Sequence, residues 1–119
     1  MAGPIAGIAT VSADGETYML AGELEYSVAA VERETLTGQD MVHGYSEKPV
    51  AGFIGGSFRD SGEYDVLIFN NMVEVTVSAS LANGKVITGS GMWTVGKQDV
   101  KTTDGTFSVR WEGPVVETT

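Results

Sequence analysis

The single histidine of the chain, His43, lies in a glycine-flanked segment close to Asp40. A histidine beside an aspartate, together with a serine, is the combination that serine hydrolases use for nucleophilic catalysis. The sequence has no nucleophile-elbow motif that would expose a serine on a sharp turn. We therefore interpret His43 as a loop residue that faces solvent or a partner. A small β-barrel hydrolase that uses His43 and a carboxylate is the less favoured hypothesis.

Closely spaced acids are the second candidate for chemistry, at Glu23 with Glu25 and at Glu32 with Glu34. Glycosidases use two carboxylates that flank the scissile bond. A spacing of two residues on a strand instead places both acids on one face. The two pairs thus indicate charged strand faces and not a glycosidase site.

The remaining residue types exclude further chemistry. The chain has no cysteine and one histidine, so disulfides, thiolate nucleophiles and Cys- or multi-His metal sites are excluded. Its glycines match neither a phosphate loop nor a dinucleotide fingerprint, and we expect them to allow close backbone packing. We predict no catalytic residue, no metal ligand and no cofactor.

Length and charge limit the possible function classes. A chain of 119 residues predicts one domain, residues 1–119. The net charge of −9 and the absence of a Lys/Arg cluster argue against tight nucleic-acid binding. No apolar run approaches 18 residues and the N-terminus lacks a signal-peptide layout, so we expect no membrane segment and a protein that stays in the cytosol.

The elements that must position these residues are mostly strands. Sixteen glycines with frequent Val and Thr predict an all-β fold, a β-sandwich or split barrel with one short helix. A first strand is expected over 5–12, followed by a tight turn at Asp14-Gly15. From Glu23 onward the alternation puts Leu24, Tyr26 and Val28 on the core face.

A long hairpin is expected over about 30–54. The alternation breaks at 28–31, and residues 32–35 carry polar groups toward both faces. Residues 37–44 hold two glycines and no periodicity, which predicts a loose tip. Tyr45 begins the return strand, which runs to Ile54.

The second half predicts a helix and three strands. Asp60 and Glu63 have capping-box spacing, and Tyr64, Leu67 and Ile68 follow as an apolar stripe of about two turns. Strands over 73–81 and 85–93 are joined at Asn83-Gly84, and pairing of Ala82 with Lys85 would set Val75 opposite Met92 and Glu74 opposite Trp93. A last strand covers 106–112, and Pro114 begins a tail over about 114–119.

Several features favour assembly over a solitary domain. They are the polar hairpin, an N-terminal arm over about 1–5, the C-terminal tail, and a sheet in which the strand over 85–93 has no cleanly polar face.

The sequence also resembles a known family. The opening Ile5-Ala6-Gly7-Ile8-Ala9, the hairpin 31–49, the turn 82–85, Trp93 and the closing segment 105–113 are similar to bacteriophage tail tube proteins of the Mu-like type. The similarity covers nearly the whole chain. It implies a tail tube-like fold related to the tubes of type VI secretion systems.

The resemblance also implies a function. Subunits of this kind form stacked hexameric rings, a hollow conduit for DNA ejection into the host, in a virion tail that is assembled in the host bacterial cytoplasm. Its expected partners are further copies of itself, a contractile sheath, a baseplate and a tail terminator. Six copies of charge −9 give −54 per ring, which would repel DNA passing through the lumen.

Two sets of site residues follow as expectations. The inter-ring contact is expected at the tip, Thr37, Gly38, Gln39, Asp40, Met41, Val42, His43 and Gly44. Glu23, Glu25 and Glu74 are candidates for an acidic lumen or sheet face. An alternative from another class is the tube of a secretion or phage tail-like injection apparatus that carries protein cargo.

Overall fold

The computed structural model describes residues 9–18, 20–62 and 65–118, and for residues 9, 22 and 23 it describes the backbone alone. The described chain is almost entirely β-structure with one short helix, α1 (Leu67–Asn70), which confirms the predicted fold class. The strands in chain order are β1 (Ala9–Ala13), β2 (Glu16–Tyr18), β3 (Leu20–Ser27), β4 (Val31–Thr37), β5 (Val42–Pro49), β6 (Phe53–Arg59), β7 (Val75–Leu81), β8 (Val86–Val95), β9 (Val100–Lys101), β10 (Thr106–Glu112) and β11 (Val115–Thr118).

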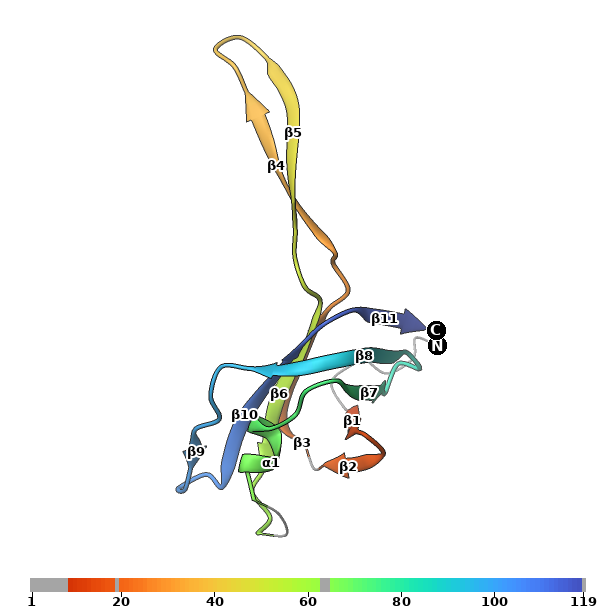
Figure 1. Cartoon of the computed structure of the whole chain (residues 1–119), viewed down its shortest axis with the longest axis vertical. Coiled ribbons are helices and arrows are strands. Elements are labelled where there is room, and N and C mark those ends of the chain that lie inside the picture. The colour runs from red at the N-terminus through yellow and green to blue at the C-terminus, as the bar shows by residue number, and fades with distance from the viewer. Residues whose placement is uncertain (1–8, 19, 63–64, 119) are drawn as a thin grey trace.

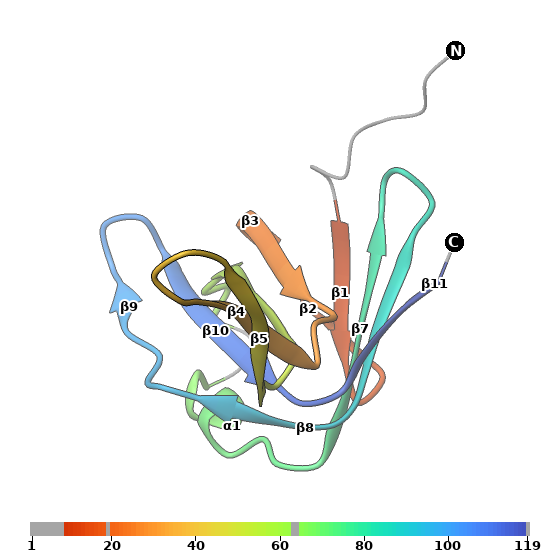
Figure 2. The same cartoon turned by 90° about the horizontal axis from the view of Figure 1, so that it is seen from above.

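Nine strands form one curled antiparallel sheet in the order β2-β1-β7-β8-β10-β6-β3, with β11 added to β8 and β9 added to β10. The ten-residue strand β8 joins the two halves, because it pairs with β7 and β11 along its first part and with β10 through its last residues. Seen along the hairpin, the sheet curves into an open half-barrel (Figure 2).

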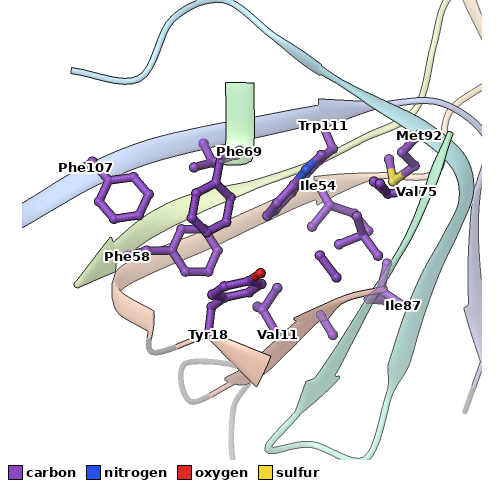
Figure 3. Close-up of a cluster of buried hydrophobic side chains, with 14 of the residues drawn as sticks. Val11, Tyr18, Ile54, Phe58, Phe69, Val75, Ile87, Met92, Phe107 and Trp111 are labelled. Carbon is purple, nitrogen blue, oxygen red and sulfur yellow. The ribbon is translucent and has the colours of Figure 1, made fainter. Parts of the chain in front are cut away.

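The core fills the concave side of this sheet. Alternate residues of β7 and β10 are buried as the period-two pattern predicts, namely Val75, Val77, Ala79 and Leu81, and Phe107, Val109 and Trp111. An aromatic cluster lies at one end of the core, with Phe69 of α1 between Tyr18, Phe58, Phe107 and Trp111 (Figure 3). The ring centroids of Phe69 and Tyr18 are 4.8 Å apart, in the edge-to-face range.

The helix differs from the prediction. It begins at Leu67 with no side-chain cap and has four residues, half of the expected two turns, while Glu63 and Tyr64 lie outside the described residues. Leu67 and Ile68 are exposed, and Phe69 is the buried residue. The helix thus inserts one aromatic ring into the core. A single turn directs only one of its side chains toward the core, so it cannot bury a row of apolar residues.

The two predicted turns behave differently. Asp14 and Gly15 both have positive φ, as the predicted turn between β1 and β2 requires. Val75 lies opposite Met92 as expected, but near the turn Ser80 pairs with Val86, so the loop has three residues, Ala82–Gly84.

A β-bulge between Val75 and Val77 restores the predicted pairing. Gly91 sits at the bulge with φ +62, a conformation that favours glycine. The predicted pairing of Ala82 with Lys85 was therefore wrong, and Val75 still faces Met92 because the one-residue offset at the turn and the one-residue offset at the bulge cancel. Glu74 precedes β7 at φ 57 and is not paired with Trp93 in the described ladder.

The C-terminal segment forms a strand and not a free tail. After Pro114, residues 115–118 form β11 and pair with β8, with Val115 opposite Gly89. Val115 packs against the core. Most of the predicted N-terminal arm and first strand, residues 1–8, lies outside the described residues.

Strands β4 and β5 form a separate two-stranded hairpin that projects from the body (Figure 1). On β3, which precedes the hairpin, Leu24 and Tyr26 pack against the core, as predicted. Val28, expected on the same face, is 47% exposed because the chain leaves the sheet after Ser27.

Candidate functional site

The hairpin has no core of its own. Every residue of β5, and every residue of β4 except Val31, is exposed. Its strands are joined by the backbone ladder and by cross-strand ion pairs, with Arg33 Nε 3.0 Å from Glu47 Oε1 and Lys48 Nζ 4.0 Å from Glu32 Oε2. Exposed ion pairs contribute at most about 1 kcal/mol each. The hairpin is therefore an arm that buries almost none of its own residues.

We call residues 37–44 the tip. The Gly38 N–H donates to the Met41 carbonyl at 2.8 Å, which closes the loop, and Gly44 has φ +125. Met41 and Val42 are 63% and 64% exposed, and Leu36 and Tyr45 flank them at 47% and 62%. The tip therefore presents apolar side chains to solvent.

His43 shapes this loop. Its imidazole ring lies directly over Gly38, where a Cβ would collide with it. Among the described residues, His43 makes no hydrogen bond or ion pair with Asp40. The structure thus places His43 in a packing role at the tip, and it assembles no hydrolase triad around it.

The acidic candidates are not gathered at one place. Glu25 lies on β3 opposite Gly55, on the convex face of the sheet, and Glu74 lies in the segment before β7. Glu23 belongs to β3, and its side chain is not described. Glu32 is paired with Lys48 on the hairpin. No single acidic face unites the described members of this set.

A shallow groove of about 310 Å³ runs over the convex face beside Glu25. Arg110 crosses it, with its guanidinium carbon 3.7 Å from the ring centroid of Phe53 and its Nε 3.1 Å from Glu112 Oε2. The small residues Gly55, Ser57 and Ser108 are among those that line it. Two cations line the groove, Arg110 and Lys97, and each has an acidic partner, Glu112 and Asp99 respectively.

Where the hairpin leaves the body there is a second pocket of about 310 Å³, which we call the root. Three chain segments and one tryptophan line it: residues 28–30, 50–52, 113–115 and Trp93. None of these residues is charged, and Val28 and Trp93 are 47% and 43% exposed. The root is therefore an open apolar surface.

Two backbone hydrogen bonds hold the root together. Val50 N–H donates to the Ala30 carbonyl at 3.0 Å, and Gly113 N–H donates to the Gly52 carbonyl at 2.9 Å. The sequence signal that could have identified the root is the small apolar run 28–31, where the alternation of the preceding strand breaks.

A polar clasp fixes β11 beside the root. Glu117 accepts hydrogen bonds from the Tyr26 hydroxyl at 2.8 Å and from Lys85 Nζ at 3.0 Å. These two hydrogen bonds lower the pKa of Glu117. The hydrogen bond from Tyr26 has the larger effect, and the one from Lys85 comes second. The same contacts raise the pKa of Tyr26 and of Lys85. The clasp thus links β3, β11 and the turn before β8 through ionised Glu117.

No group of three or more His, Asp or Glu side chains is close enough to hold a metal ion in the described part of the chain. None of the described helices has the length and apolar character needed to cross a membrane.

Comparison with known proteins identifies the family. No curated protein matches the sequence. The family model described as phage tail tube protein matches residues 2–118, nearly the whole chain, which confirms the resemblance at the level of the family. The chain therefore belongs to the phage tail tube proteins, and it is a structural component of a virion tail and not an enzyme.

Proposed function

We propose that this protein is the repeating subunit of a hollow tail tube made of stacked hexameric rings, through which DNA passes during ejection. The observation that carries the proposal is the exposed hairpin, which ends in apolar residues that no described part of the same chain covers. An exposed apolar end on a projecting arm is explained by a partner surface better than by solvent.

Ring formation would use the open edges of the sheet. The strand order ends at β2 and β3, and β11 pairs on one side with β8. Unpaired strand edges are templates for pairing with another chain. A head-to-tail contact between two different edges closes into a ring when the rotation between copies allows it.

The further details of the proposal follow from the resemblance. They are the Mu-like type with its relation to type VI secretion tubes, a contractile sheath around the tube, contacts with baseplate and tail terminator proteins, and assembly in the host cytoplasm. The net charge of −9 per subunit supports weak interaction with the DNA that passes through the lumen.

Negative-stain microscopy of the purified protein tests the proposal. The parent should form rings or tubes, and a variant with residues 37–44 replaced by a short Gly-Ser link should stay folded and form single rings but not long tubes. A variant with the exposed Thr102 and Thr103 changed to Gly-Ser serves as control and should form tubes like the parent. Parent protein that stays dispersed at every concentration, or tip-less protein that polymerises equally well, would contradict the proposal.

A further inference from the structure

The root and the tip have matching character. The root is uncharged along its whole lining, and it leaves Val28 and Trp93 about half exposed. The tip and its flanks leave Met41, Val42 and Tyr45 more than 60% exposed. Each is an apolar surface that the described part of the chain does not cover.

Charge restricts where two copies can meet. Each subunit carries −9, so a contact between copies costs least where the surfaces that it buries hold no carboxylate. The root lining has no charged residue, and Met41 and Val42 are the exposed apolar residues of the tip. Asp40 lies beside them, and it would remain in water at the rim of such a contact.

One chain cannot make this contact with itself. The tip and the root lie at opposite ends of the hairpin (Figure 1). Seven paired positions of β4 and β5 separate them, which is about 23 Å at 3.3 Å per residue. A one-way contact between different patches on identical molecules propagates from copy to copy, and it closes as a two-fold dimer only where each tip enters the root of the other copy.

We propose that the tip of one copy docks into the root of a second copy, with Met41 and Val42 packed against Trp93 and Val28. The proposal rests on the tube assembly proposed above, and it names the receiving surface on the next subunit. The partner is a second copy of this chain, because it supplies both halves of the contact.

The size of the contact explains why it would act only in an array. The four exposed apolar residues of the tip and its flanks would bury roughly 400 Å², or roughly 800 Å² counting both copies, below the ~1,000 Å² of a stable interface. A single contact therefore holds two subunits weakly. Repeated around a ring, the contacts act together, because each one raises the effective concentration of the next.

Cysteine cross-linking tests the docking, and the chain offers a clean background because it has no native cysteine. A Met41→Cys protein is mixed with an Ala51→Cys protein of different tag length, under assembly conditions, and treated with a short bismaleimide. Ala51 is an exposed root residue, so the substitution should leave the fold intact. The yield of cross-linked mixed dimer should exceed the yield from the control pair, Met41→Cys with Asn83→Cys, by about tenfold. The reason is that a docked tip reaches a millimolar effective concentration at the root.

Each outcome decides a separate question. If microscopy shows tubes but the two cysteine pairs give equal yields of cross-linked dimer, the docking is overturned and the tube proposal stands. A root-specific mixed dimer without any rings or tubes would support the docking and count against the tube. Neither tubes nor a root-specific dimer would overturn both.

Discussion

Gly52 shows how one missing side chain permits the hairpin to join the body. A Cβ at this position would lie 2.8 Å from the Ser27 carbonyl oxygen and 3.0 Å from that of Gly113. Both contacts are with backbone, which cannot move aside as the end of a flexible side chain can. The close approach of three segments at the root therefore requires glycine at position 52.

Glu117 provides a pH-dependent prediction at the same scale. The folded state holds the pKa of Glu117 below its ordinary value of 4.5, so the unfolded chain takes up a proton first as the pH falls. The clasp therefore stabilises the fold fully above about pH 4.5 and loses this effect as the pH falls through the lowered folded pKa. Because the folded state raises the pKa of Tyr26 and of Lys85, the stabilisation also begins to fall above about pH 10 and is lost as the pH rises through the raised folded pKa values.

The expected result is a difference between melting curves. Glu117→Gln should lower the Tm between about pH 5 and 9, and the difference from the parent should shrink below pH 4.5. Thermal denaturation by circular dichroism over this range measures it. Glu34→Gln, on the exposed strand β4, removes one carboxylate without touching the clasp and is the matched control. If the difference in Tm between Glu117→Gln and the parent were the same at all pH values, the role of the clasp would be refuted.

Helix α1 contributes to stability through one side chain. Phe69 is fully buried against four aromatic rings, whereas Leu67 in the same turn is 63% exposed. We expect Phe69→Ala to lower the free energy of unfolding by about 3–5 kcal/mol, because it removes a large buried ring and leaves a cavity. Urea denaturation monitored by circular dichroism measures this loss.

The same helix supplies the control. Leu67→Ala deletes a comparable apolar side chain from an exposed position, and it should change the free energy of unfolding by no more than about 0.5 kcal/mol. Similar losses from both substitutions would show that the helix is stabilised along its whole surface and not through Phe69.

For the whole molecule, the charge distribution predicts negligible binding of duplex DNA. The net charge is −9, and at least five of the seven basic residues lie within 4.0 Å of a carboxylate. Without a free basic stripe there is no site that releases counterions from phosphates. At about 0.15 M salt, micromolar protein should therefore leave the mobility of free duplex unchanged.

A gel-shift titration at two salt concentrations checks this prediction. A shifted band that disappears steeply as salt is added would show a basic surface that the charge pattern does not reveal. The result bears on the proposed passage of DNA through the tube, because a subunit that bound duplex tightly would hinder that passage.

Local patterns in the sequence predicted most of the strands. The alternation of Val75, Val77 and Ala79 predicted which face of β7 is buried, and Asp14-Gly15 predicted a turn with positive φ. The projecting hairpin could also be predicted, since its strands are polar toward both faces. In each case neighbouring residues carry the signal, because side-chain period and turn geometry are local properties.

Only the tertiary structure decided the features that depend on distant partners. The bulge at Gly91 depends on the facing strand, and β11 forms because β8 offers it an unpaired edge. The root joins residues 28–30, 50–52 and 113–115, which carry no periodic pattern. Small apolar residues of this kind have no preferred face, so the segments packed around them, and not the adjacent residues, determine whether they form core, turn or contact surface.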